Sequence, residues 1–148
     1  MKSFVYCEWI DDDRLLRALP SARFVARVTL DDYRLAFVSF KEDGNDTILK
    51  GGCYLEPAPG QQAAGLLYEF DDTALNEAER LSRVEQGRYC GKSFTVRDSE
   101  GRAHEAVAYV IKNPVGSASP STEYKNNMLN GARKHGFSSE YISYISAL

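Results

Sequence analysis

The chain has 148 residues, of which 43% are hydrophobic and 26% charged, and 21 acidic residues against 18 basic ones give a net charge of −3. This composition is ordinary for a globular protein, and we expect residues 1–148 to form a single domain. The chain has no basic stripe that could neutralise phosphates and no apolar run near the roughly 20 residues of a membrane span, so we expect neither nucleic acid nor membrane as a partner.

The N-terminal part of the chain predicts strands around one short helix. Residues 3–9 are aromatic and β-branched, as in a buried strand, and residues 11–20 form a short helical or irregular segment. Residues 22–30 and 33–40 are further strand candidates. The pair Asp31–Asp32 between them predicts a turn.

The middle of the chain continues the strand pattern and then changes to a helical one. Residues 41–46 form a solvated loop, and residues 47–57 form a strand whose paired glycines indicate a bulge or a close backbone approach. Residues 58–62 predict a turn into another strand at 63–70. The helical period then covers residues 73–86.

The C-terminal part predicts a hairpin and two helices. Strands at 88–98 and 102–113 flank a short polar turn, and a loop of small residues follows at 114–121. A helix capped by Ser121 runs to about Lys134, and a last helix covers residues 139–148. Six or seven strands with so few helices favour an α+β fold, namely a small mixed or antiparallel β-barrel with a few flanking helices.

The helix predicted at 73–86 places Ser82 on its inward face. At about 100° per residue, Ser82 lies about 20° from Leu75 around the helix axis, and Ala78 lies about 60° from it. Glu79 and Glu85 fall at the edges of this apolar stripe. A serine here either donates its hydroxyl back to the carbonyl of Ala78 or serves a site inside the fold.

The three cysteines, Cys7, Cys53 and Cys90, are widely spaced, and the two histidines are too scattered to complete a zinc site. We therefore expect no metal, and we expect reduced cysteines in the core of a cytoplasmic protein. The letters "GKS" at 91–93 do not end a phosphate loop, because the leading position is Gln86 rather than glycine. The sequence accordingly implies no cofactor.

Three stretches of the chain resemble the gamma-glutamylcyclotransferase family, including relatives such as the butirosin gamma-glutamyl-removing enzyme. They are the opening strand "FVY", the segment "GGCYLEPAPGQQAAGLLYEFDDTALNEAE" and the tail "PSTEYKNNMLNGARKHGFSSEYISYI". The likeness covers nearly the whole chain. It implies a small-molecule partner, either a γ-glutamyl compound or an amino-acid-like one.

The resemblance also implies a chemistry. In that family a "YGSN"-like loop holds the substrate's α-carboxylate through backbone amides, and a glutamate in an "LD-x-x-EG" context is the general base. An α-amino group is largely protonated near neutral pH, so the base must remove a proton before the amine can attack its own γ-carbonyl. Ring closure then gives 5-oxoproline and the released amine, and the base contributes roughly 10²–10⁴-fold to the rate.

The loop of the family motif is altered in this chain. Tyr6 matches the family tyrosine, but the following Gly-Ser-Asn is replaced by Cys7, Glu8 and Trp9. A side chain now stands where the backbone approached the ligand, and Cys7 adopts a positive φ less easily than glycine does.

The position of the family base is altered as well. Counting back without a gap from Tyr89, the glutamate falls on Ser82 and the glycine after it falls on Arg83. Tyr89 and Tyr124 match positions where the family has pocket tyrosines. The resemblance therefore names Glu8 and Ser82 as the catalytic positions, and it names five substrate-binding residues: Tyr6, Cys7, Trp9, Tyr89 and Tyr124.

The sequence leaves open whether the chain is an enzyme. In the first hypothesis it is a catalytically silent relative that binds a small molecule or a protein, because serine has no low-pKa site with which to replace a glutamate base. In the second, it is an active cyclotransferase for a γ-glutamyl amine or amide, with the base relocated to Glu8 or, less simply, to Glu79 or Glu85.

Two further possibilities depend on other residues. A thiol nucleophile would be Cys7 or Cys90 with His104 or His135 as its partner, although nothing in the spacing brings these residues together. A protein-binding role would show as an exposed apolar patch on the tail, formed by Tyr141, Ile142, Tyr144 and Ile145. The sequence does not reveal the oligomeric state.

Overall fold

Six strands and five helical segments make up the protein, whose computed structural model describes residues 1–148. The strands are β1 (Lys2–Val5), β2 (Arg23–Phe40), β3 (Leu49–Glu69), β4 (Tyr89–Asp98), β5 (Ala103–Ile111) and β6 (Pro114–Ser117). The helices are the 3-10 turn η1 (Glu8–Ile10), α1 (Asp12–Ala18), α2 (Asp72–Leu81), α3 (Thr122–Lys134) and α4 (Ser139–Ser146). None of these helices has the length and apolar character that crossing a bilayer requires.

Five of the strands close into a barrel. β1 pairs antiparallel with β3 and parallel with β5, and β4 pairs antiparallel with both β5 and β2. The long antiparallel pair of β2 and β3 completes the ring, while β6 adds to β2 outside it. The predicted α+β fold with a small mixed barrel is therefore confirmed.

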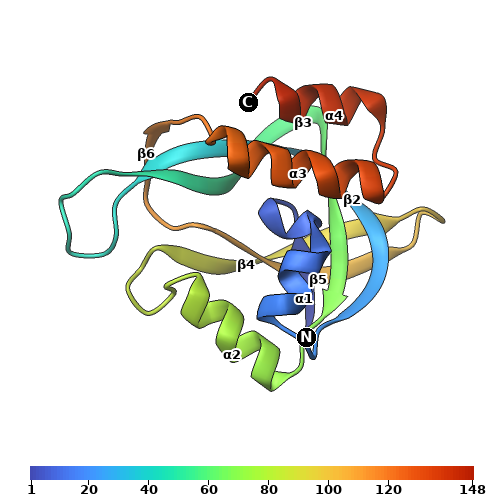
Figure 1. Ribbon diagram of the computed structural model, residues 1–148, viewed down its shortest axis with the longest axis horizontal. Coiled ribbons are helices and arrows are strands. Elements are labelled where there is room, and N and C mark those ends of the chain that lie inside the picture. Colours follow the sequence, from blue (N-terminus) through green and yellow to red (C-terminus); the bar gives the residue numbers. More distant parts are fainter.

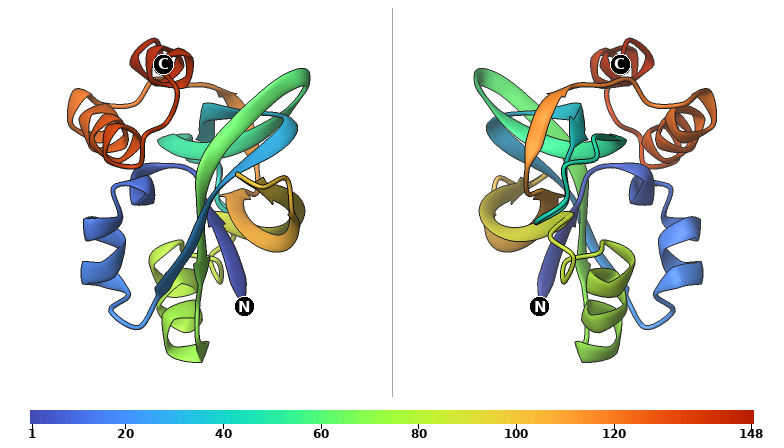
Figure 2. Two further views of the ribbon diagram at one scale, coloured as in Figure 1. Left: turned by 90° about the vertical axis from the view of Figure 1, so that its right-hand side faces the viewer. Right: turned by 90° about the vertical axis from the view of Figure 1, so that its left-hand side faces the viewer.

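The helices gather on one side of this barrel. In Figure 2 both views place the helical segments beside the barrel rather than around it. Figure 1 shows α3 and α4 together near the top, α2 near the bottom, and α1 with η1 between them. The turn η1, which follows β1, contacts α3.

The two turns predicted inside the long strands are wrong. Asp32 adopts a left-handed φ of 65°. Asp31 pairs with Gln62 and Tyr33 pairs with Pro57, so residues 58–61 of β3 lie opposite the single residue Asp32 of β2. The Asp32 carboxylate accepts a hydrogen bond from the Gly60 amide at 3.0 Å. These turn-forming residues build a bulge, which bends β2 and β3 without ending them.

Two element ends and one loop also differ from the prediction. β1 ends at Val5 and a 3-10 turn follows, so residues 3–9 are not one strand. α2 ends at Leu81 rather than near residue 86. The loop predicted at 114–121 contains the short strand β6. The polar loop, the β4–β5 hairpin, the helices α1, α3 and α4, and the Ser121 cap agree with the prediction.

Two glycines permit close packing that a side chain would prevent. A Cβ on Gly131 would lie 2.3 Å from the backbone of Ile10, so α3 packs directly against η1. A Cβ on Gly52 would lie 2.3 Å from the Ile111 side chain. The first of these contacts fixes the chain that follows β1. The bulge expected at the glycine pair is present, because Val38 pairs with Gly52 and Ser39 with Lys50, which leaves Gly51 unpaired.

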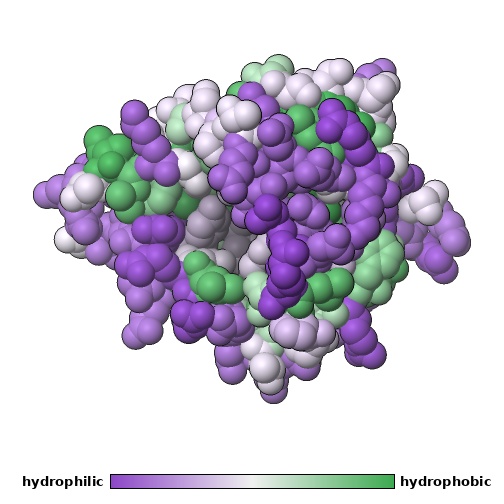
Figure 3. All heavy atoms as spheres, in the orientation of Figure 1, coloured by the Kyte–Doolittle hydropathy of each residue, from purple (hydrophilic) through white to green (hydrophobic).

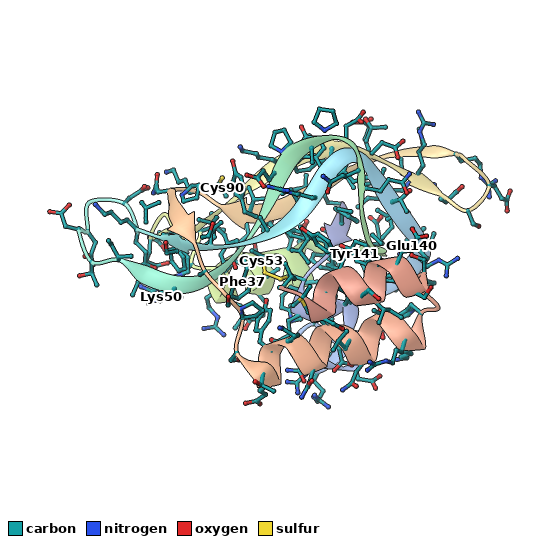
Figure 4. All side chains as sticks on the ribbon, turned by 90° about the horizontal axis from the view of Figure 1, so that it is seen from above. Phe37, Lys50, Cys53, Cys90, Glu140 and Tyr141 are labelled. Atoms are coloured by element: carbon teal, nitrogen blue, oxygen red, sulfur yellow. A yellow bond between two sulfur atoms is a disulfide. The ribbon has the colours of Figure 1, made fainter.

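A disulfide joins the same segment to the barrel. Cys7 and Cys53 are bonded, with their Cα atoms 6.6 Å apart, and the bond is visible beside the label of Cys53 in Figure 4. The expectation of reduced cysteines is therefore wrong for this pair, while Cys90 is free. Disulfides persist mainly in oxidising compartments, and this bond therefore gives no support to a cytoplasmic location. That location stays a prediction.

A buried carboxylate, Asp12, ties α1 to β3 and to the end of α3. It accepts hydrogen bonds from the Tyr68 hydroxyl at 2.7 Å and from Lys134 Nζ at 2.8 Å. His135 Nε2 lies 3.0 Å from the same carboxylate. Burial alone would raise the pKa of Asp12, but these hydrogen bonds lower it to about 2.

We predict that Asp12→Asn lowers the free energy of unfolding by about 2 kcal/mol at pH 7. The pKa of Asp12 is lower in the folded state than in the unfolded state. Its contribution is therefore complete above the ordinary carboxyl pKa of 3.8 and is lost as the pH falls towards about 2. Urea unfolding at several pH values measures this. Asp13→Asn is the matched control, because the Asp13 side chain is 71% exposed. A difference between wild type and Asp12→Asn that stays constant down to pH 3 would contradict the prediction.

We also predict that losing the disulfide destabilises the fold. Cys7 and Cys53 are 46 residues apart, and closing such a loop stabilises a domain by about 2–4 kcal/mol. The double variant Cys7→Ser/Cys53→Ser, and the wild type in dithiothreitol, should both lose about this much in urea unfolding. Cys90→Ser keeps the disulfide and is expected to change stability far less. Unfolding that is insensitive to reductant would show that this bond does not support the fold.

Candidate functional site

A pocket of about 240 Å³ opens on the side of the barrel that carries the helices. Figure 3 shows this face hollowed near its centre, between the regions of α2 and α3. All seven residues predicted for the site line the pocket: Tyr6, Cys7, Glu8, Trp9, Ser82, Tyr89 and Tyr124. The other lining residues are Ser3, Phe4, Val5, Cys53, Phe70, Leu81 and Tyr109.

One wall of the pocket is the segment from Tyr6 to Trp9, which we call the N-terminal turn. Its backbone begins the 3-10 turn, because the Ile10 amide bonds the Cys7 carbonyl at 3.2 Å. The disulfide to Cys53 and the packing of α3 on Ile10 hold it from two sides. Cys7, Glu8 and Trp9 therefore face the pocket from a fixed backbone.

Glu8 is the charged residue of the N-terminal turn, and its carboxylate is held in place. Asn127, which is 6% exposed, donates from Nδ2 to Glu8 Oε2 at 2.8 Å. Arg14 in turn donates to Asn127 Oδ1 at 2.9 Å, which fixes the orientation of the amide. Glu8 Oε1 has no hydrogen-bond partner within the chain. The carboxylate thus has one fixed oxygen and one that is available to a ligand.

Another wall comes from the C-terminal end of α2. The amides of Arg83 and Val84 bond the carbonyls of Arg80 and Glu79 at 3.2 and 3.1 Å, which is the Schellman arrangement of a helix end. Arg83 has a φ of 49°, at the position where such an end favours glycine.

Ser82 is the C-cap of this helix and lines the pocket. The bond to the Ala78 carbonyl comes from the Ser82 backbone amide, at 2.9 Å, and not from its hydroxyl. Leu81 beside it is 45% exposed and lies at the rim of the pocket. The helix end therefore presents a small hydroxyl and an apolar side chain to the pocket.

The tyrosines that line the pocket are bonded to its walls. The Tyr6 hydroxyl donates to the Tyr109 carbonyl at 2.7 Å, and the Tyr89 hydroxyl accepts from the Cys53 amide at 3.1 Å. The Tyr124 hydroxyl lies 3.0 Å from the sulfur of Cys7 and 3.2 Å from that of Cys53. These contacts tie the rings to the N-terminal turn and to β3.

Burial keeps these phenols neutral. It raises the pKa of Tyr6 well above its ordinary value, and neighbouring tyrosines add to this shift. Burial, followed by the proximity of Tyr89 and Glu8, likewise raises the pKa of Tyr124. The pKa of Tyr89 is raised by burial too. Phenols of this kind supply neutral ring faces and hydroxyls rather than anions.

Tyr109 is a pocket residue that sequence reasoning missed. It lies in β5, and its hydroxyl donates to Glu79 Oε2 at 3.1 Å. Burial and the nearby Glu79 carboxylate raise its pKa. Nothing in its local sequence distinguishes it from other strand tyrosines, because its place in the pocket depends on the pairing of β5 with β1 and β4.

The weaker base candidates do not line the pocket. Glu79 reaches its edge through Tyr109, and Glu85 is exposed beyond the end of α2. Glu8 is therefore the one carboxylate among the residues that line the pocket.

The thiol hypothesis has no support in this arrangement. Cys7 is bonded to Cys53, and Cys90 does not line the pocket. His104 lies 2.9 Å from an Asp98 oxygen, and His135 lies beside Asp12. Neither histidine is therefore paired with a cysteine.

The apolar tail does not form an exposed patch. Ile145 is fully buried, and Tyr141, Ile142 and Tyr144 are partly buried against the main core. The Tyr144 hydroxyl donates to the Leu35 carbonyl. This tail covers the barrel and leaves no broad apolar surface for a protein partner.

Comparison with known proteins shows where this fold and pocket belong. The model of the AIG2-like family matches residues 62–145. The gamma-glutamylcyclotransferase of Homo sapiens is 26% identical over 145 residues, which cover 98% of this chain and 77% of that protein. A solved structure of a gamma-glutamyl cyclotransferase superposes with a TM-score of 0.86 at 25% identity, over all of this chain and 87% of that one.

A more distant structure shares the fold. YkqA from Bacillus subtilis superposes with a TM-score of 0.79 at 20% identity, over 99% of this chain and 53% of that one. With the matched family model and the similar structures, the resemblance inferred from three stretches of sequence is confirmed. The chain belongs to the AIG2-like family and is a gamma-glutamylcyclotransferase-like protein.

Proposed function

We propose that this protein binds a small γ-glutamyl or amino-acid-like compound in the pocket and does not catalyse the cyclisation after which its relatives are named. The observation that carries this proposal is Ser82, a hydroxyl at the end of α2 where the resemblance places the general base. A serine hydroxyl cannot accept the ammonium proton near neutral pH without activation by another group.

The backbone at the end of α2 supports this placement of the base. In the family motif a glycine follows the glutamate, and the residue after Ser82 is Arg83 with its left-handed φ of 49°. A glycine takes this conformation without strain, whereas an arginine adopts it at a cost of roughly 1–2 kcal/mol. The retained backbone therefore favours the ungapped alignment of Ser82 with the family glutamate.

The pocket itself supports binding. Its volume of about 240 Å³ suits a small molecule, and most of its lining is aromatic or apolar with a few fixed polar groups. The relatives' name, gamma-glutamylcyclotransferase, suggests a γ-glutamyl compound as the ligand. The disulfide and the held Glu8 indicate a preformed site.

A second candidate is an active cyclotransferase in which Glu8 is the base. This candidate is favoured by the position of Glu8, which lines the same pocket. Asn127 holds Oε2 of the Glu8 carboxylate and leaves Oε1 available to a substrate. In this reaction Glu8 would take a proton from the α-ammonium group, and the amine would attack the γ-carbonyl carbon. The bond from that carbon to the departing amine would break as the ring bond forms. The ring nitrogen would give up a second proton, and both protons would pass to the departing amine, which leaves as an ammonium ion.

We predict that the wild type binds γ-glutamyl amides without releasing 5-oxoproline. Trp9 is the single tryptophan of the chain and lines the pocket, so its fluorescence reports binding at this site. Mass spectrometry of 5-oxoproline over a panel of γ-glutamyl amino acids and amines measures turnover. Turnover by the wild type that disappears in Glu8→Gln would establish the second candidate instead. Turnover that survives Glu8→Gln would contradict both candidates.

We further predict that Ser82→Glu, introduced into the Glu8→Gln variant, gains 5-oxoproline release, because the carboxylate at the end of α2 is then the one carboxylate in the pocket. A positioned base contributes roughly 10²–10⁴-fold to the rate, so even partial recovery is measurable. Ser82→Gln in the same Glu8→Gln variant is the matched control, since it has the same shape without the charge. Equal release by the two variants, both folded and both binding, would remove the support for Ser82 as the position of the family base.

A further inference from the structure

The charge of the pocket differs from what an α-carboxylate ligand requires. Among the fourteen residues that line it, Glu8 carries a negative charge and none is lysine, arginine or histidine. The nearby Arg14 is turned to Asp11 and Asn127, with which it forms hydrogen bonds of 3.2 and 2.9 Å. Arg88 lies over the Phe40 ring and pairs with Glu42. Neither guanidinium balances the charge inside the pocket.

The remaining lining reinforces this preference for a cation. Trp9 and the tyrosines present aromatic rings, whose negative faces attract ammonium groups. The tyrosine hydroxyls are already bonded to backbone groups, to the disulfide or to Glu79. The other donors of the lining, such as the hydroxyls of Ser3 and Ser82, are neutral, so a ligand carboxylate would lie beside a second carboxylate in a partly apolar space with no cation to balance them.

The Glu8 carboxylate is also held in an orientation that suits binding of a ligand. Asn127, itself buried and oriented by Arg14, immobilises one carboxylate oxygen and leaves Oε1 for another partner. The disulfide and the contact of Gly131 with Ile10 prevent the N-terminal turn from moving Glu8 away. An ammonium group at Oε1 would complete the pairing of this carboxylate.

We propose that the pocket recognises its ligand by an ammonium group, held between Glu8 and the aromatic rings, and not by an α-carboxylate. The inference rests on the proposed binding function and names its ligand class: amides of 4-aminobutanoic acid and other small ω-amino acyl compounds, with γ-glutamyl amides accepted through their amine alone. The replacement of the family's Gly-Ser-Asn by Cys-Glu-Trp thereby changes the charge that the N-terminal turn selects.

Three probes of the same length separate the two charges. The γ-glutamyl, 4-aminobutanoyl and glutaryl amides of butylamine carry, respectively, both groups, the ammonium alone and the carboxylate alone. Binding is measured by Trp9 fluorescence and by calorimetry on the whole chain with its disulfide intact. We expect the 4-aminobutanoyl amide to bind at least as tightly as the γ-glutamyl amide, and the glutaryl amide to bind at least tenfold more weakly.

Glu8→Gln tests which residue makes this distinction. It should reduce the difference between the 4-aminobutanoyl and glutaryl amides to less than about threefold, where a tenfold change corresponds to about 1.4 kcal/mol. Glu85→Gln makes the same chemical change at an exposed position away from the pocket and should leave the difference intact. Circular dichroism and thermal unfolding establish that both variants are folded.

The outcomes distinguish this inference from the function on which it rests. Binding of all three probes with equal affinity, or tighter binding of the glutaryl amide, would overturn the ammonium preference while leaving the pocket a binding site. A preference that persists in Glu8→Gln would overturn the role of Glu8. Binding of none of the probes would overturn the proposed binding function and this inference together.

Discussion

The arrangement of the pocket depends on how the chain leaves β1. A strand that ends at Val5 would ordinarily pass into a mobile loop, but here α3 packs against the backbone of Ile10 at Gly131. The disulfide from Cys7 to Cys53 anchors the same segment to β3, and Asn127 fixes the carboxylate that it carries. Three different constraints, steric, covalent and polar, thus hold one short turn against the barrel.

The consequence of this rigidity is a pocket whose charge is set by one residue. Glu8 cannot turn to solvent without breaking its bond to Asn127, and the lining offers no cation to neutralise it. At the same time, Ser82 leaves the end of α2 without a titratable group near neutral pH. The fold of the gamma-glutamylcyclotransferase-like proteins is retained, and in this chain the N-terminal turn carries a carboxylate, Glu8, while the end of α2 carries a hydroxyl, Ser82. A carboxylate at the turn can hold an ammonium group, and the proposed function follows from that difference.

Sequence reasoning predicted the fold class and most elements, and its errors have local causes. Asp31–Asp32 and residues 58–62 have the composition of turns, yet they face each other and form a bulge within two long strands. No local pattern distinguishes a turn from a bulge when the partner strand is unknown. The end of α2 was placed too late because Arg83, in the left-handed conformation, is not a typical residue for a helix end.

The site was predicted mainly through the family resemblance. Tyr6, Ser82, Tyr89 and Tyr124 come from distant parts of the chain, and no spacing rule would have brought them together. The disulfide was missed because a separation of 46 residues carries no signal, and Tyr109 was missed because its position depends on strand order.

A crystal structure with the γ-glutamyl amide of butylamine bound would test the central claim most directly, because this ligand carries both an ammonium group and a carboxylate. The account predicts that the ammonium nitrogen lies about 2.7–3.2 Å from Glu8 Oε1 and that the α-carboxylate points out of the pocket. An α-carboxylate bound by the backbone amides of Cys7, Glu8 and Trp9, with the ammonium group directed towards Ser82, would contradict it.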